Sequence, residues 1–170
     1  METNRNIVAI FDIDGTLGDD VPAYENYPNC ESSVISTPTT HVKFIVRPHS
    51  KKFIRKLISV GCDVAIWSSG HHDYVHKIVS TLFGEFDWKF IWDSSKCTSS
   101  IKDMREICAD TTVKHVLFDD NYETCDYNTL LGFNCVKVEP FNARMSENDK
   151  FFEIMCDTFN ELVYVKPSIT

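Results

Sequence analysis

The sequence predicts an α/β fold with a central parallel sheet. Short apolar runs alternate along the chain with segments whose apolar residues recur every three or four positions, the spacing of one helix face. Strands that alternate with helices are typical of a parallel sheet covered by helices. Several apolar runs end in carboxylates or hydroxyls, and ligands bind at the carboxyl ends of strands in such sheets.

Each expected strand is a short, mostly apolar run. A run such as DVAIW at residues 63–67 is too short for a helix and suits a sheet that is covered on both faces. The expected strands are residues 6–11, 41–47, 63–67, 89–92, 115–118 and 134–138.

Each expected helix shows an apolar face, a starting signal or an ending signal. Pro48 suits a first helical turn, where its missing N–H costs no hydrogen bond, and Gly61 and Gly84 suit helix ends. Ser100 and Asp103 have the spacing of a capping box, and the last expected helix also begins with Ser-x-x-Asp. The expected helices are one that Pro48 opens and Gly61 caps, and residues 71–83, 100–108 and 146–164.

Residues 17–40 carry three prolines and many serines and threonines, so we expect an irregular segment there. Long segments of this kind are often functional. We expect residues 1–170 to form one domain, with a core at about 5–163 and an insertion at about 18–46. The loops leave little room for a large cap domain.

Composition and charge exclude some classes of protein. The net charge of −8 argues against direct nucleic acid binding, which needs clustered basic residues. The sequence shows no signal-peptide pattern and no membrane-spanning stretch, so we expect an intracellular protein, cytoplasmic or nuclear, without a membrane partner. The seven cysteines include no Cys-x-x-Cys pair and predict free thiols in a reducing compartment.

The most informative stretch joins an apolar run to Asp12, Asp14, Gly15 and Thr16. Alternate residues of a strand point the same way, so Asp12 and Asp14 are expected to face one spot, where a hard divalent cation would offset their repulsion. Gly15 permits a sharp turn, and Thr16 offers a hydroxyl. This set suits binding a phosphate beside Mg²⁺ and attacking it with a carboxylate. The alternative is a polar turn after a strand.

Later residues extend this set in a recognisable order. The chain resembles the haloacid dehalogenase (HAD) superfamily of phosphotransferases, which has four motifs. Their counterparts follow in the same order: Asp12-Ile-Asp-Gly-Thr16, Ser68, Lys102 and Asp119-Asp120. The resemblance implies a HAD-like Rossmannoid fold, in which helices flank a central parallel sheet. It also implies a short hairpin or flap after the first motif and no large cap domain.

A narrower resemblance involves three further features. The chain resembles the Fcp/Scp-type phosphatases, also called NLI-interacting-factor-like phosphatases. The resemblance lies in Arg47-Pro48-His49 before a helix, Trp67-Ser68-Ser69 after a strand, and Tyr74. That family removes phosphate from serines in the C-terminal tail of RNA polymerase II and from related phosphoproteins. The chain departs from the family pattern at Gly15, where glutamate is usual, and at Ser68, where threonine is common. The segment before Arg47 is also short.

The resemblance implies a role for each acidic residue. Asp12 would attack phosphorus and form an aspartyl-phosphate, and Asp14 would protonate the leaving oxygen and then accept a proton from water. Mg²⁺ would be held by Asp12, the backbone carbonyl of Asp14, and Asp120. Asp119 would orient these groups without binding the metal.

The remaining assignments concern phosphate binding. The resemblance assigns Thr16, Ser68 and Lys102 to the phosphate, and Lys102 also to the orientation of the nucleophile. Ser69 shares the assignment with Ser68, and either serine has an alternative as a helix N-cap. Lys96 is the alternative to Lys102. The adjacent His71 and His72 resemble a metal pair, but neighbours on a helix do not share a face, so we expect them at a helix start or at the rim of the site.

These observations predict a Mg²⁺-dependent protein serine/threonine phosphatase. Its partner would be a phosphoprotein or phosphopeptide, for which the RNA polymerase II C-terminal tail is one candidate. Two alternatives stay open. One is a HAD phosphatase for a small substrate such as a nucleotide or sugar, and the other is a noncatalytic phosphoprotein-binding scaffold on the same fold.

Overall fold

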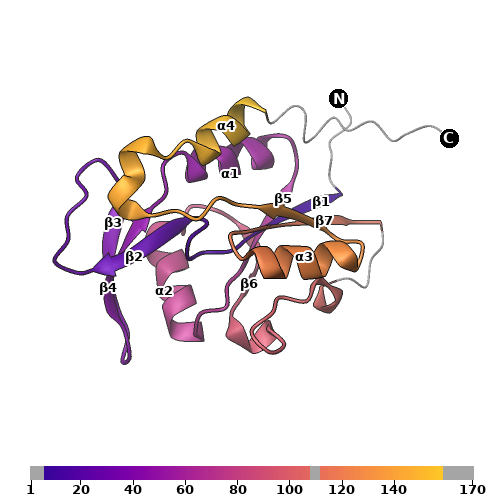
Figure 1. Ribbon diagram of the computed structural model, residues 1–170, viewed down its shortest axis with the longest axis horizontal. Coiled ribbons are helices and arrows are strands. Elements are labelled where there is room, and N and C mark those ends of the chain that lie inside the picture. The colour runs from indigo at the N-terminus through magenta and orange to yellow at the C-terminus, as the bar shows by residue number, and fades with distance from the viewer. Residues whose placement is uncertain (1–5, 108–111, 159–170) are drawn as a thin grey trace.

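The computed structural model describes residues 6–107 and 112–158, which contain a five-stranded parallel sheet in the order β6-β5-β1-β7-β8 (Figure 1). The prediction of a parallel sheet flanked by helices, without a large cap, is confirmed. The strands of this sheet are β1 (Ile7–Phe11), β5 (Asp63–Trp67), β6 (Trp88–Trp92), β7 (Lys114–Asp119) and β8 (Asn134–Lys137). The helices are α1 (Ser50–Ser59), α2 (His72–Leu82), α3 (Tyr122–Leu130) and α4 (Phe151–Asp157), with 3-10 segments η1 (Ser94–Lys96), η2 (Met104–Glu106) and η3 (Ala143–Asn148).

Both faces of the central sheet are covered, because its side chains alternate between two apolar clusters. In β1, Ala9 and Phe11 belong to one cluster and Val8 and Ile10 to the other. Phe53 of α1 packs edge-on against Phe11, with ring centroids 6.3 Å apart. Figure 1 shows α1 and α4 on one side of the sheet and α3 on the other.

A second sheet occupies the expected insertion. Strands β2 (Gly18–Pro22), β4 (His41–Val46) and β3 (Ser32–Ser36) pair antiparallel in that order. The expectation of an irregular segment at residues 17–40 is therefore wrong. The strands β2 and β3 are rich in Asp, Ser and Pro, which have low strand propensity, and it is pairing with the more apolar β4 that orders them.

Two expected helices differ in the structure. The first was expected at 100–108, of which Cys108 lies outside the described residues; Ser99 and Ser100 have positive φ angles of 50° and 66°, and within residues 100–107 only η2 forms, so the capping box is wrong. The expected helix at 146–164 is divided between η3 and α4, because Asp149 is extended and its carboxylate is bound by Arg47; the part beyond residue 158 lies outside the described residues.

Helix α3 was not predicted, because its sequence YETCDYNTL has no continuous apolar face. It begins at Asn121, whose side chain accepts hydrogen bonds from the backbone N–H groups of Glu123 and Thr124. Its packing on β8 brings Cys125 to Cys135, which form a disulfide.

The prediction that the cysteines are free thiols is thus wrong for Cys125 and Cys135. The spacing of these two residues gave no signal in the sequence, and their approach depends on the packing of α3 against β8. Among the described residues, the free cysteines are Cys30, Cys62, Cys97 and Cys156, while Cys108 lies outside them. Within residues 6–107 and 112–158, the structure contains no helix of the length and apolarity needed to cross a bilayer.

Candidate active site

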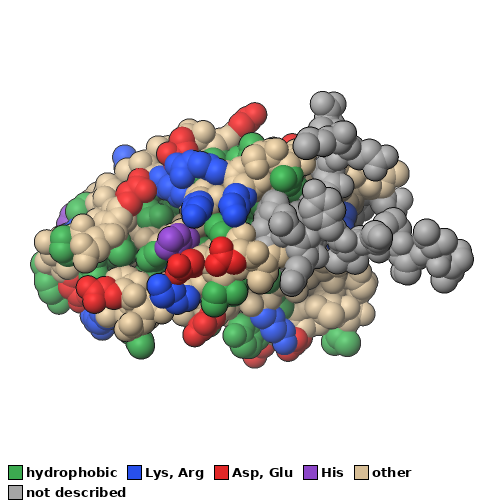
Figure 2. Space-filling model, turned by 90° about the horizontal axis from the view of Figure 1, so that it is seen from above, with side chains coloured by type: hydrophobic (Ala, Val, Ile, Leu, Met, Phe, Trp, Pro, Cys, Tyr) green, Lys and Arg blue, Asp and Glu red, His purple; other side chains and the backbone are tan. Residues whose placement is uncertain are grey.

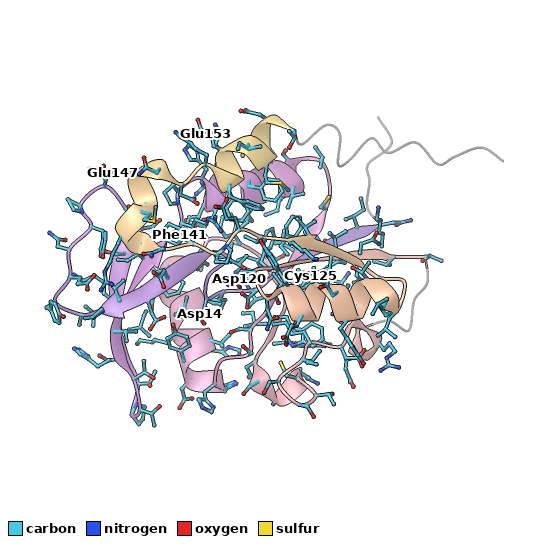
Figure 3. All side chains as sticks on the ribbon, viewed as in Figure 1. Asp14, Asp120, Cys125, Phe141, Glu147 and Glu153 are labelled. Carbon is cyan, nitrogen blue, oxygen red and sulfur yellow. A yellow bond between two sulfur atoms is a disulfide. The ribbon has the colours of Figure 1, made fainter. Side chains whose placement is uncertain are left out.

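The register of β1 and β7 places two carboxylates side by side. Phe11 pairs with Phe118, and the Asp12 N–H extends this pairing by donating to the Phe118 carbonyl at 3.0 Å. Asp12 therefore lies next to Asp119 at the carboxyl edge of the sheet. Figure 3 shows Asp14 and Asp120 in the same central region, where the antiparallel sheet meets the central sheet.

Lys102 joins the carboxylates of Asp12 and Asp119. Its Nζ lies 2.7 Å from Asp12 Oδ1 and 2.6 Å from Asp119 Oδ2, and all three side chains are buried. Asn128 of α3 holds the main chain around this lysine, because it donates to the Lys102 carbonyl at 2.7 Å and accepts from the Met104 N–H at 2.9 Å. The unpredicted helix therefore positions the predicted lysine.

The turn after Asp12 brings Thr16 to Asp12 and Asp120. Its hydroxyl lies 3.1 Å from Asp12 Oδ2 and accepts from the Asp120 N–H at 3.2 Å. Gly15 has a φ of +80°, and a Cβ at this position would overlap the Asp120 carboxylate. The glycine found where the resembling family usually has glutamate thus suits the left-handed backbone and leaves room for the Asp120 carboxylate.

Asp14 is half-buried and faces α2. The hydroxyl of Tyr74 donates a hydrogen bond to Asp14 Oδ1 at 2.7 Å. Tyr74 was noted in the sequence only as part of a family pattern, and no role was assigned to it. The structure shows that it orients the second carboxylate of the Asp-x-Asp motif.

The two candidate serines have different environments. Ser68 is buried; its N–H donates to the Trp92 carbonyl at 2.9 Å, and its Oγ accepts from the Gly70 N–H at 3.0 Å. Ser69 is exposed. The Nζ of Lys96, the alternative to Lys102, lies 5.1 Å from the Trp92 ring centroid, whereas Lys102 contacts Asp12 directly.

The buried charges of the site are unbalanced. Burial raises the pKa of Asp12 and of Asp119 to about 6, against the opposing effect of Lys102. Burial also disfavours the charge of Lys102, but the two carboxylates outweigh it and hold the lysine pKa above its ordinary value. Asp120 adds a third carboxylate whose pKa burial also raises. One ammonium therefore faces three carboxylates.

This donor set fits a hard divalent cation. Asp12, Asp119 and Asp120 each offer an oxygen, and these oxygens lie within 4.8 Å of one another. Asp119 already uses both oxygens, since one accepts from Lys102 and the other from the Asn121 N–H at 2.8 Å. Asp12 likewise uses both oxygens, Oδ1 for Lys102 and Oδ2 for the Thr16 hydroxyl at 3.1 Å, so all three carboxylates stay in the candidate ligand set.

Arg47 lies behind the site rather than in it. It is buried and binds Asp149 through Nε at 3.0 Å and through a terminal nitrogen at 2.8 Å. Its other terminal nitrogen lies 3.4 Å from the carbonyls of Gly15 and Thr16. Arg47 thus ties the loop that follows Asp12 to the segment before α4.

A separate cluster outside these carboxylates was missed. His72 and His76 of α2 lie close to Asp93 at the end of β6. Sequence reasoning considered only the adjacent pair His71 and His72. The signal that was available is the four-residue spacing of His72 and His76, which places both on one face of the expected helix.

The fold and the site define the class of the protein. A parallel α/β sheet whose central strand ends in Asp-x-Asp, with a lysine bridging that strand to the next carboxylate, is the arrangement of a HAD-like phosphatase. The model of the family described as NLI interacting factor-like phosphatase matches residues 7–168, and the chain belongs to this family.

Comparison with solved structures agrees with this fold. The structure of the RNA polymerase II CTD phosphatase Fcp1 is similar with a TM-score of 0.59 at 19% identity, over 95% of this chain and 55% of that one. Fission yeast Fcp1 bound to beryllium fluoride is similar with a TM-score of 0.58 at 20% identity, over 91% and 50%. The chain thus spans about half the length of these structures and shares their fold. None of the curated proteins matches it.

Proposed function

We propose that this protein is a Mg²⁺-dependent phosphatase for phosphoserine or phosphothreonine in proteins, acting through an aspartyl-phosphate. The observation that carries the proposal is the buried contact of Lys102 with Asp12, beside an Asp14 carboxylate held by Tyr74. An aspartate nucleophile needs a nearby cation to approach a phosphate dianion, and a second carboxylate to handle the proton.

In the first step, an oxygen of Asp12 forms a bond to phosphorus while the bond from phosphorus to the serine or threonine oxygen breaks. Asp14 gives its proton to that leaving oxygen. In the second step, water attacks phosphorus, Asp14 takes a proton from the water, and the bond between phosphorus and Asp12 breaks. Burial raises the pKa of Asp14 to about 6, although its hydrogen bond from Tyr74 opposes this rise, so the group suits both proton transfers near neutral pH.

Mg²⁺ would be held by Asp12, Asp120 and the backbone carbonyl of Asp14. When bound, it supplies positive charge that offsets the repulsion between nucleophile and phosphate. Asp119 orients Lys102 in this proposal, through the 2.6 Å contact of its Oδ2 with the lysine Nζ.

Phosphate oxygens are bound by Lys102, Ser68 and Thr16 in this proposal, with backbone N–H groups near Gly15 completing the site. Ser69, which is exposed, contributes at the outer side of the phosphate. Within the part of the chain that the structure describes, no large cap covers the site, and an open site suits phosphate carried on a protein. Fcp1, whose structure is similar to this chain, is an RNA polymerase II CTD phosphatase, so a phosphorylated C-terminal repeat is the first substrate to test.

The test is phosphate release from an aryl phosphate and from phosphoserine peptides, with Mg²⁺ and with a chelator. The native chain is compared with Asp12→Asn and with Asp87→Asn, an exposed aspartate that serves as a matched control. We expect metal-dependent turnover that Asp12→Asn abolishes and Asp87→Asn preserves. Faster turnover of nucleoside monophosphates than of peptides would contradict the protein substrate. Absence of turnover on all substrates, with the fold intact, would contradict catalysis and favour a phosphoprotein-binding scaffold.

A further inference from the structure

Two histidines of α2 and one aspartate after β6 form a compact cluster on the surface. His72 and His76 are four residues apart, and their ring centroids lie 4.1 Å from each other. The Asp93 carboxylate faces them, with Oδ2 at 2.9 Å from His72 Nδ1. One ligand atom from each residue lies within 4.8 Å of those of the other two. The cluster is separate from Asp12, Asp119 and Asp120.

The three side chains divide into a fixed part and a movable part. Asp93 is buried, and its Oδ1 accepts from the Ser95 N–H at 2.9 Å, while its Oδ2 faces the histidines and is paired with His72 Nδ1. The His72 side chain is 68% exposed, so its imidazole has room to reorient. A metal ion needs its ligand atoms closer together than 4.8 Å, and small rotations of the exposed His72 imidazole and the half-buried His76 imidazole would bring them there.

We propose that His72, His76 and Asp93 form a second metal site, one that binds a divalent transition metal such as Zn²⁺. Two imidazole nitrogens with one carboxylate oxygen are a donor set that Zn²⁺ accepts, and three protein ligands leave a fourth position open. The carboxylate set of Asp12 and Asp120 offers only oxygen and selects hard ions such as Mg²⁺. The two sites therefore differ in the metal that they prefer.

The position of the cluster ties two loops together. The Ser94 N–H donates to the Gly70 carbonyl at 2.9 Å, so the loop after β6 is already joined to the loop after β5. His72 begins α2 directly after that second loop, which carries Ser68 and Ser69. A metal bound by His72, His76 and Asp93 would add a second link between the same loops. Its open position would face the groove between α2 and the turn from β3 to β4.

The test is direct metal binding, which does not depend on phosphatase activity. Zn²⁺ is titrated into metal-free protein by calorimetry and by competition with a chromophoric chelator. Every protein in the series carries Asp120→Asn, which weakens the carboxylate site. Co²⁺ is a second probe, because tetrahedral Co²⁺ absorbs visible light far more strongly than octahedral Co²⁺.

We expect one Zn²⁺ per chain, with affinity reduced about tenfold or more by His76→Gln and by His72→Gln. His71→Gln is the matched control, because His71 is an exposed neighbour outside the cluster. Thermal unfolding in chelator checks that each variant folds. Asp93→Asn is a further variant, and its Zn²⁺ affinity is interpreted only if it unfolds at the same temperature as the parent. The proposal is overturned if Zn²⁺ does not bind at micromolar concentration, or if His71→Gln weakens binding as much as His76→Gln does.

Discussion

The hydroxyl of Tyr74 donates a 2.7 Å hydrogen bond to Asp14 and connects α2 to the loop that follows β1. The acceptor is the carboxylate proposed as the acid and base, so the contact has two effects. It fixes the direction of the carboxylate, and it stabilises its charged form against the burial that raises its pKa to about 6. Tyr74 is thus a positioning residue, which acts through Asp14.

Tyr74→Phe removes this hydrogen bond and leaves the ring in place. Without this hydrogen bond the pKa of Asp14 rises further, so Asp14 stays protonated to higher pH. The alkaline limb of the plot of rate against pH therefore shifts to higher pH. We expect kcat for a phosphoserine peptide to fall about tenfold, the effect of a lost hydrogen bond to a charged group. The measurement is kcat against pH, with the exposed Tyr24→Phe as control. A lower rate with an unshifted profile would contradict the role.

Lys102→Met removes the ammonium that contacts both Asp12 and Asp119, and leaves these two carboxylates buried without it. We expect turnover to be lost and the free energy of unfolding near neutral pH to fall by about 3 kcal/mol, as for a broken buried ion pair. Near pH 5, where the two raised pKa values of about 6 keep the carboxylates mostly protonated, the loss of stability is smaller. Urea unfolding at both pH values measures this. Lys96→Met is the control, and an equal loss in that variant would refute the assignment.

The central sheet and the order of its chemical residues were predictable because both depend on local sequence. Apolar runs predict buried strands, and Asp12 and Asp119 directly follow or end such runs. Once the strands are parallel, their carboxyl ends meet at one edge, which brings these residues together wherever they lie in the chain.

The remaining features depend on contacts that no local pattern encodes. β2 and β3 are polar strands that are ordered by their pairing with β4. The contacts of Asn128 with the Lys102 segment, and of Tyr74 with Asp14, arise only after α3 and α2 pack against the sheet. The same holds for the disulfide of Cys125 and Cys135. Tertiary packing overrides propensity at each of these positions.

The metal-free protein is expected to lose stability as the pH rises. Burial raises the pKa values of Asp12, Asp14 and Asp119 to about 6, whereas an unfolded chain has aspartates near 3.9. Between these values the folded state binds more protons than the unfolded state, so the free energy of unfolding falls through this window and stays low above it. Urea unfolding in chelator, near pH 5 and near pH 7.5, measures the difference. Equal or greater stability at the higher pH would contradict the assignment.

Adding Mg²⁺ should reverse this loss. The ion binds the ionised carboxylates of the folded state, so it stabilises the protein more at about pH 7.5 than at about pH 5.

The control residue comes from another face of the molecule. Figure 2 shows basic side chains gathered on the face above α1 and α4. Carboxylates of that face are not part of the site, so Glu153→Gln on α4 is a suitable control. Asp120→Asn should abolish the Mg²⁺ effect and Glu153→Gln should leave it unchanged. An effect that persists in Asp120→Asn would place the ion elsewhere.

Gly15→Ala separates the backbone cost of the turn from the contact with Asp120. Gly15 and Gly132 both have a positive φ, of +80° and +89°, but a Cβ at Gly132 meets nothing within 4 Å, while one at Gly15 overlaps the Asp120 carboxylate. Each alanine should cost about 1 kcal/mol of stability, because the left-handed region is strained for a residue with a Cβ. Only Gly15→Ala should also displace Asp120, and we expect its Mg²⁺ affinity to fall about tenfold with a matching loss of turnover at limiting Mg²⁺. Calorimetric titration with Mg²⁺ compares the two variants. Equal Mg²⁺ affinity in both would mean that Asp120 does not hold the ion, whatever the two substitutions do to stability.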